Sequence, residues 1–138
     1  MEILKKMKFL FLSLLFVFGG LILQSSTNDT QDEWPVPAEF KNMKNPMAGK
    51  ADAKKVGKTL FDQHCASCHG AEGYGDGKKA SQLDTEMRDL TSKEVLAQTD
   101  GELYYKSFIG RDEMPNFEKK ITSVDDRWFI VNYMRTLK

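Results

Sequence analysis

The sequence predicts an all-α fold, and three observations support this prediction. Apolar residues recur at offsets of three and four between Ala53 and His64, which is the period of one helix face. Further along the chain, three predicted helix starts carry a serine or threonine followed three residues later by an acidic residue, a pattern typical of helix starts. No stretch shows the sustained alternation of apolar and polar residues that is typical of strands.

Each predicted helix has its own start signal. The first begins at Asp52 and runs directly into Cys65. The next three begin with capping boxes, in which a hydroxyl and an acidic side chain satisfy free amides of the first turn. The pairs are Thr91 with Glu94, Thr99 with Glu102, and Ser123 with Asp126.

The last two of these helices carry further signals. The helix after Thr99 is expected to end near Gly110, because glycine commonly follows the last helical residue. The final helix carries an apolar stripe that would face the core. Its members are Val124, Trp128, Val131 and Met134, with Ile130 and Leu137 beside them.

Two segments are expected to precede the folded domain, which we place at residues 50–138. Residues 1–24 combine three lysines with an apolar run, which predicts a secretory signal peptide. The run is shorter than the roughly 20 residues of a comfortable membrane span, so a retained membrane anchor is the less favoured alternative. Residues 25–49 are polar and contain prolines, which predicts a tether, with Trp34 and Phe40 as anchors on the domain.

One short motif carries most of the predicted chemistry. Cys65-Ala66-Ser67-Cys68-His69 has the spacing Cys-x-x-Cys-His, the attachment signature for a c-type haem. Cysteines three apart share one face of a helical turn, so both sulfurs can reach one edge of a porphyrin. The histidine then approaches the iron from the same side. The sequence therefore predicts one haem c, held by Cys65 and Cys68 and ligated by His69.

Three other interpretations of the cysteine pair compete with haem. A thioredoxin-like redox site needs a surrounding βαβ pattern, and none is visible. A closed zinc site usually needs four ligands, and His64 and His69 would have to complete it from positions beside the cysteines. A small structural disulfide would leave His69 unexplained.

Met114 is the best candidate for the second axial ligand of the iron. It lies in a loop between two predicted helices, is followed by the stiffening Pro115, and belongs to no helical stripe. Met87 is its main rival. The remaining candidates lie in the tether, on the last helix, or beside Cys65 on the wrong side of the haem: Met43, Met47, Met134 and His64.

Four stretches together resemble the class I cytochrome c domain, over about residues 50 to 138. They are Cys65-Ala66-Ser67-Cys68-His69-Gly70, Gly73-Tyr74-Gly75-Asp76-Gly77, Gly110-Arg111-Asp112-Glu113-Met114-Pro115, and the helix from Trp128 to Leu137. The resemblance implies that the first and last helices cross around one haem. On that pattern the residues that meet are Gly57 and Phe61 on one helix and Trp128, Tyr133 or Met134 on the other.

The same resemblance implies roles for particular residues. Cys65 and Cys68 would form thioether bonds, His69 and Met114 would ligate the iron, and Leu90 would pack on the haem face. Many members of the family have a proline after the haem motif whose carbonyl orients the histidine, but this chain has no proline between His69 and Met114. We therefore expect a carbonyl of residues 73–76 to accept the proton of the second ring nitrogen.

The leading functional prediction is a monohaem electron carrier that is not an enzyme. Its location would be the periplasm or the outer face of the cytoplasmic membrane. Its partners would be redox proteins, namely a membrane dehydrogenase, a quinol-oxidising complex or a terminal oxidase. Lys and Arg total 20 and Asp and Glu total 20, so no nucleic-acid partner is expected. The alternatives are a haem enzyme or gas or peroxide sensor with a labile sixth ligand, and a module without haem.

Overall fold

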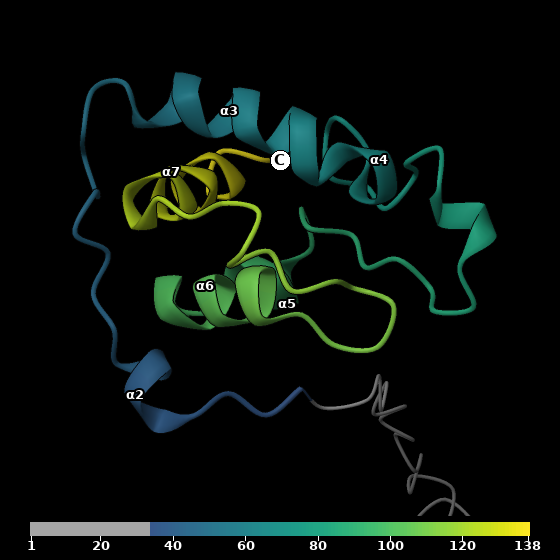
Figure 1. Ribbon diagram of the computed structural model, residues 1–138, viewed down its shortest axis with the longest axis horizontal. Helices are drawn as coiled ribbons and strands as arrows, with labels where there is room; N and C mark the ends of the chain where they lie inside the picture. The colour runs from purple at the N-terminus through teal and green to yellow at the C-terminus, as the bar shows by residue number, and fades with distance from the viewer. Residues whose placement is uncertain (1–33) are drawn as a thin grey trace, which may run out of the picture. The chain divides into compact units, whose positions relative to one another are not determined.

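The computed structural model describes residues 34–138, and its regular structure over this range is helical (Figure 1). The elements are α2 (Ala38–Lys41), α3 (Ala53–His64), α4 (Ala66–His69), the 3₁₀ turn η1 (Ala80–Gln82), α5 (Lys93–Leu96), α6 (Asp100–Ile109) and α7 (Val124–Met134). Within the described residues, β pairing is confined to one isolated bridge between Arg111 and Met114. The prediction of an all-α fold is confirmed.

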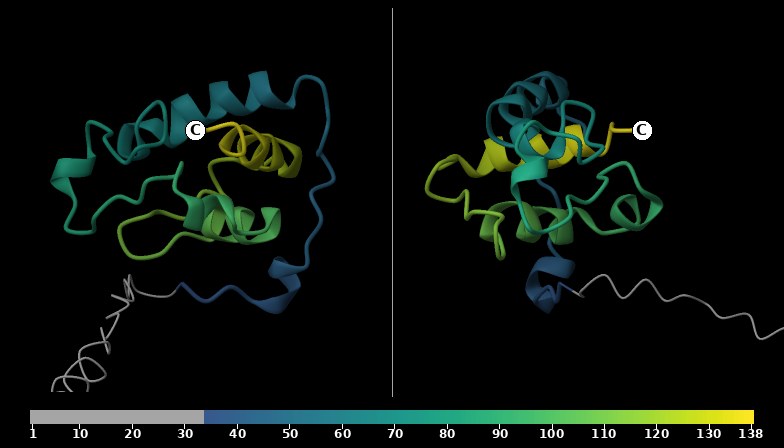
Figure 2. Two further views of the ribbon diagram at one scale, coloured as in Figure 1. Left: turned by 180° about the vertical axis from the view of Figure 1, so that it is seen from behind. Right: turned by 90° about the vertical axis from the view of Figure 1, so that its right-hand side faces the viewer.

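The helices α3 and α7 cross at close range, as Figures 1 and 2 show. Gly57 marks the crossing, because a Cβ atom there would lie 2.0 Å from the carbonyl oxygen of Phe129. Only glycine allows two backbones to approach so closely. One turn later, the fully buried ring of Phe61 packs against Tyr133 with a centroid distance of 5.2 Å. The crossing that the family resemblance implied is therefore present.

The core extends from the contact of α3 with α7 to the contact of α7 with α6. The ring of Tyr104 on α6 packs on Trp128 at 4.3 Å and on Phe108 at 5.0 Å. Ile130 and Val131 of α7 are completely buried. The predicted stripe of α7 was wrong at one position. Val124 is the first residue of the helix and is 52% exposed, so the buried face begins a turn later.

The helix starts test the capping predictions directly. Thr99 and Glu102 form the predicted capping box at α6. At α7 the hydroxyl half of the predicted capping box is present, since the Ser123 side chain accepts a hydrogen bond from the amide of Asp126. The prediction at Thr91 was wrong by one residue, because Ser92 is the cap of α5.

Two neighbouring hydroxyls explain this error. The amide and the hydroxyl of Thr91 both donate to the carboxylate of Asp89, at 2.7 Å. The hydroxyl of Ser92 is therefore the one left to cap α5, and it accepts a hydrogen bond from the amide of Val95. A side-chain acceptor two residues upstream thus decides which hydroxyl caps the helix.

Residues 34–50 form a strap along α6 and α7. The ring of Phe40 packs against Tyr105 at 4.8 Å, and the ring of Trp34 lies 4.8 Å from the guanidinium of Arg111. The predicted leader, residues 1–24, and the first part of the predicted tether lie outside the described residues. Among residues 34–138, no helix has the length and apolar character needed to cross a membrane.

Asn45 fixes the strap to both helices. Its amide nitrogen donates to Asp100 of α6 at 3.0 Å and to Asn132 of α7 at 2.8 Å. Its amide oxygen accepts from the amide of Met47 at 2.9 Å. One side chain therefore satisfies three polar groups in a partly buried position.

Asn45→Ala is expected to lower the free energy of unfolding by about 1–2 kcal/mol, because three partly buried groups lose their partner. Urea unfolding followed by circular dichroism measures the loss. Asn42→Ala is the matched control, since the Asn42 side chain is exposed. Equal stabilities for the two variants would contradict the structural role of Asn45.

Candidate functional site

The motif of two cysteines and one histidine lies where α3 passes into α4. Cys65 ends α3, since its amide donates to the carbonyl of Phe61 at 2.8 Å. The carbonyl of Cys65 then accepts from the amides of Cys68 and His69, at 3.1 and 3.0 Å. These bonds fold the motif into a single tight turn. The turn therefore carries both thiols and the imidazole on one rigid piece of backbone.

A glycine-rich loop wraps around this turn. The amide of Gly75 donates to the carbonyl of His69 at 2.8 Å, and the amide of Gly77 donates to that of Cys68 at 3.1 Å. A Cβ atom on Gly77 would lie 2.5 Å from the Cys68 carbonyl oxygen. The glycine at position 77 is therefore explained by the close approach of the loop to the backbone of the motif, and the two hydrogen bonds hold the motif in place.

Burial controls the chemistry of the motif. It raises the pKa of the Cys65 thiol to about 12, with a smaller contribution from Cys68, so Cys65 is a neutral thiol at physiological pH. The two thiols are free rather than joined in a disulfide. Burial also lowers the pKa of His69, which favours the neutral imidazole, the form that binds metals.

The Nδ1 atom of His69 is buried and has no hydrogen-bond partner among the described residues. The carbonyl of Gly73 is already occupied, since it accepts from the amide of Leu90 at 2.7 Å. The predicted acceptor within residues 73–76 is therefore not found. The bond between Leu90 and Gly73 does place Leu90 beside the loop that follows the haem motif.

Met114 lies in a tight turn after α6. The helix ends at Gly110, as predicted, and Arg111 and Met114 then exchange two backbone hydrogen bonds of 3.0 and 2.9 Å. Asp112 in this turn has a φ of 54°, a left-handed value that is uncommon outside glycine. Met114 therefore belongs to a constrained turn rather than to a helix, as the sequence indicated.

Phe117, three residues after Met114, contacts the last residue of α3. Its amide donates to the carbonyl of Phe108 at 2.9 Å, and its ring lies edge-on to the ring of His64 at 6.3 Å. His64 directly precedes Cys65, so the chain just after Met114 passes the haem-attachment turn. The sequence analysis missed Phe117, although an aromatic residue three positions after Met114 was a visible signal.

Apolar side chains from separate parts of the chain border the motif and, like Cys65 and Ala66 within it, are only partly buried. The bordering residues are Leu60, Leu90 and Phe117. The motif supplies two thiols and an imidazole whose Nδ1 atom is buried and unpartnered among the described residues, and the turn that precedes Phe117 supplies a methionine. These residues fit a c-type haem, which requires thioether attachment, an imidazole ligand and an apolar surround.

Met87 and Met134, two other candidate ligands, lie in different surroundings. A Cβ atom on Gly75 would lie 3.2 Å from the Cβ of Met87, which places Met87 against the loop around the His69 turn. Met134 is buried in the core, with its sulfur 3.7 Å from the hydroxyl of Ser107. Within residues 34–138, no group of three or more His, Cys, Asp or Glu side chains could hold a metal ion.

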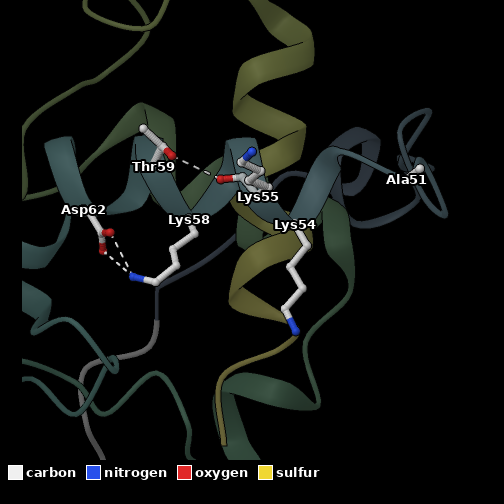
Figure 3. Close-up of a pocket in the computed structure, with 6 residues that line it drawn as sticks. All are labelled: Ala51, Lys54, Lys55, Lys58, Thr59 and Asp62. Atoms are coloured by element: carbon white, nitrogen blue, oxygen red, sulfur yellow. Dashed lines mark hydrogen bonds and ion pairs between the residues drawn. The ribbon is translucent and has the colours of Figure 1, made fainter.

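The outer face of α3 carries a surface hollow that is separate from the motif (Figure 3). Its lining residues are exposed, and the Lys58 ammonium pairs with Asp62 at 2.8 Å. The lining residues are Ala51, Lys54, Lys55, Lys58, Thr59 and Asp62. None of the predicted ligands lines it, so it is not the cofactor site.

Two features together are typical of a small haem-binding domain. The helices α3 and α7 cross at Gly57, and a Cys-x-x-Cys-His turn follows directly at the end of α3. A comparison with protein families matches residues 54–138 to the family Cytochrome c. The chain therefore belongs to the cytochrome c family, whose members are typically haem c electron carriers. A search of curated proteins gives no match to this chain.

Proposed function

We propose that the protein is a monohaem c-type cytochrome that carries single electrons outside the cytoplasmic membrane and is not itself an enzyme. The observation that supports this most strongly is the single turn formed by Cys65, Cys68 and His69, with the Met114 turn reaching its border through Phe117. In this proposal the cysteines hold haem c by thioether bonds. His69 and Met114 are the axial ligands.

The bound haem supplies one-electron redox chemistry. The chain supplies the setting for it. His69, on its rigid turn, would supply an imidazole nitrogen to the iron, and Met114 would supply a thioether sulfur. With both ligands bound, the iron would keep no open position for oxygen or peroxide, and the thioether would raise the reduction potential relative to a second imidazole.

The apolar border limits access of water to the site. Leu90 and Phe117 contribute side chains that are partly buried against the core. A low local dielectric disfavours the extra charge of the ferric state, so these residues also support a higher potential. Electrons would pass through an exposed haem edge to a membrane dehydrogenase, a quinol-oxidising complex or a terminal oxidase.

A visible spectrum of the exported protein, oxidised and reduced, tests the proposal. We expect sharp reduced haem bands and the weak far-red iron–sulfur charge-transfer band of the ferric form. Haem bands without the far-red band would contradict Met114 ligation and favour a ligand-binding haem protein. A purified protein with no visible absorbance, despite working haem-attachment machinery, would contradict the haem proposal itself.

A further inference from the structure

Glu113 joins two irregular segments that are far apart in the sequence. Its carboxylate oxygens accept hydrogen bonds from the backbone amides of Asp84 at 3.2 Å and Thr85 at 2.7 Å. One segment is the turn of residues 110–115, and the other is residues 83–88, between η1 and α5. Hydrogen bonds to an ionised acceptor are the stronger kind, and here both point to one side chain.

The position of Glu113 gives this contact a consequence beyond packing. The next residue is Met114, and the turn is closed by the backbone pair between Arg111 and Met114. That pair fixes the shape of the turn but not its distance from the neighbouring segment. The hydrogen bonds of the Glu113 carboxylate fix this distance, because they join the turn to the amides of residues 84 and 85. The pKa of Glu113 is lowered, chiefly by the hydrogen bond from the backbone of Thr85, which agrees with an ionised acceptor.

We propose that Glu113 is a positioning residue for the axial ligand, because its carboxylate latches the Met114 turn to residues 83–88 and so slows dissociation of the Met114 sulfur from the iron. The inference rests on the proposed function, since it needs Met114 to be the ligand. The latch consists of Glu113 and the amides of residues 84 and 85. The Thr85 side chain adds a further hydrogen bond to the two main-chain donors. Because every one of these bonds ends on the Glu113 carboxylate, substitution of Glu113 removes them together.

The test uses the full exported chain with its haem and measures the exchange of Met114 for added imidazole. Imidazole binds ferric haem only after the sulfur leaves, so the rate at high imidazole reports how often the turn opens. We expect Glu113→Ala to exchange about threefold to tenfold faster than the wild type, since the charge-assisted hydrogen bonds of the latch are lost. Glu113→Gln keeps one acceptor oxygen and should lie between the two.

Glu86→Ala is the matched control. It removes the same charge from the adjoining segment, and Glu86 is exposed and outside the latch. It should exchange imidazole at the wild-type rate. The urea midpoints of Glu113→Ala and Glu86→Ala are measured alongside. The gain in exchange rate of Glu113→Ala should exceed what the fall in its own urea midpoint accounts for, which separates a positioning role from a general loss of stability.

The outcomes distinguish the latch from the proposed function. If the wild type has the far-red band and Glu113→Ala exchanges at the rate of Glu86→Ala, the latch is wrong and Met114 ligation stands. If Glu113→Ala exchanges faster only in proportion to a lowered urea midpoint, the positioning role is also wrong. If the wild type lacks the band, Met114 ligation fails, and the latch fails with it.

Discussion

Gly57→Ala is expected to lower the free energy of unfolding by about 3 kcal/mol, the upper end of the usual cost of overpacking. The new methyl carbon would lie 2.0 Å from the carbonyl oxygen and 2.7 Å from the carbonyl carbon of Phe129. Both are backbone atoms, so no side-chain rotation can relieve the clash. The helices α3 and α7 must separate, and the packing of Phe61 on Tyr133 loosens with them.

The sign of this effect makes the prediction sharp. In an unconstrained helix, replacing glycine by alanine is stabilising by about 0.5–1 kcal/mol. Urea unfolding followed by circular dichroism measures the change. Lys54→Ala is the control on the exposed face of the same helix, and it should stay within about 0.5 kcal/mol of the wild type. A Gly57→Ala protein as stable as the wild type, or more stable, would contradict the close crossing of α3 and α7.

Local signals in the sequence predicted the elements well. The apolar period before Cys65, the Thr99 capping box and the glycine at position 110 each act within a few residues, and the structure reproduces all three. The haem motif is equally local, since its turn is made by bonds within residues 61 to 70. The prediction that Thr91 caps α5 was wrong for a local reason too, because the Thr91 hydroxyl donates to the carboxylate of Asp89.

Contacts between distant segments could not be predicted from these signals. Glu113 meets amides 28 and 29 positions away, and any residue type offers such amides, so no pattern points to the pair. Asn45 reaches two helices 55 and 87 positions away. The sequence shows both Phe117 and His64, but it does not show that their rings lie side by side in the fold. The sequence therefore predicts which residues hold the haem, whereas the contacts that support those residues become visible only in the fold.

Met114→Ala is expected to remove the far-red band of the ferric protein and to open the reduced protein to carbon monoxide. The reduction potential should fall by roughly 100 mV or more, within the range of about 0.8 V that axial ligation spans. The physical reason is that a thioether favours ferrous iron, and its loss leaves the position to water. Absorbance spectra, carbon monoxide titration and a redox titration measure the three effects.

Two further variants show whether the effect belongs to ligation. Met114→His should restore a strong sixth ligand, so it should block carbon monoxide while keeping a potential below that of the wild type. Met87→Ala removes the rival sulfur beside Gly75 and should keep the far-red band. If instead Met87→Ala lost the band and Met114→Ala kept it, Met87 would be the ligand. The Met114 turn would then be a structural feature, because its bonds to Arg111 do not depend on the sulfur.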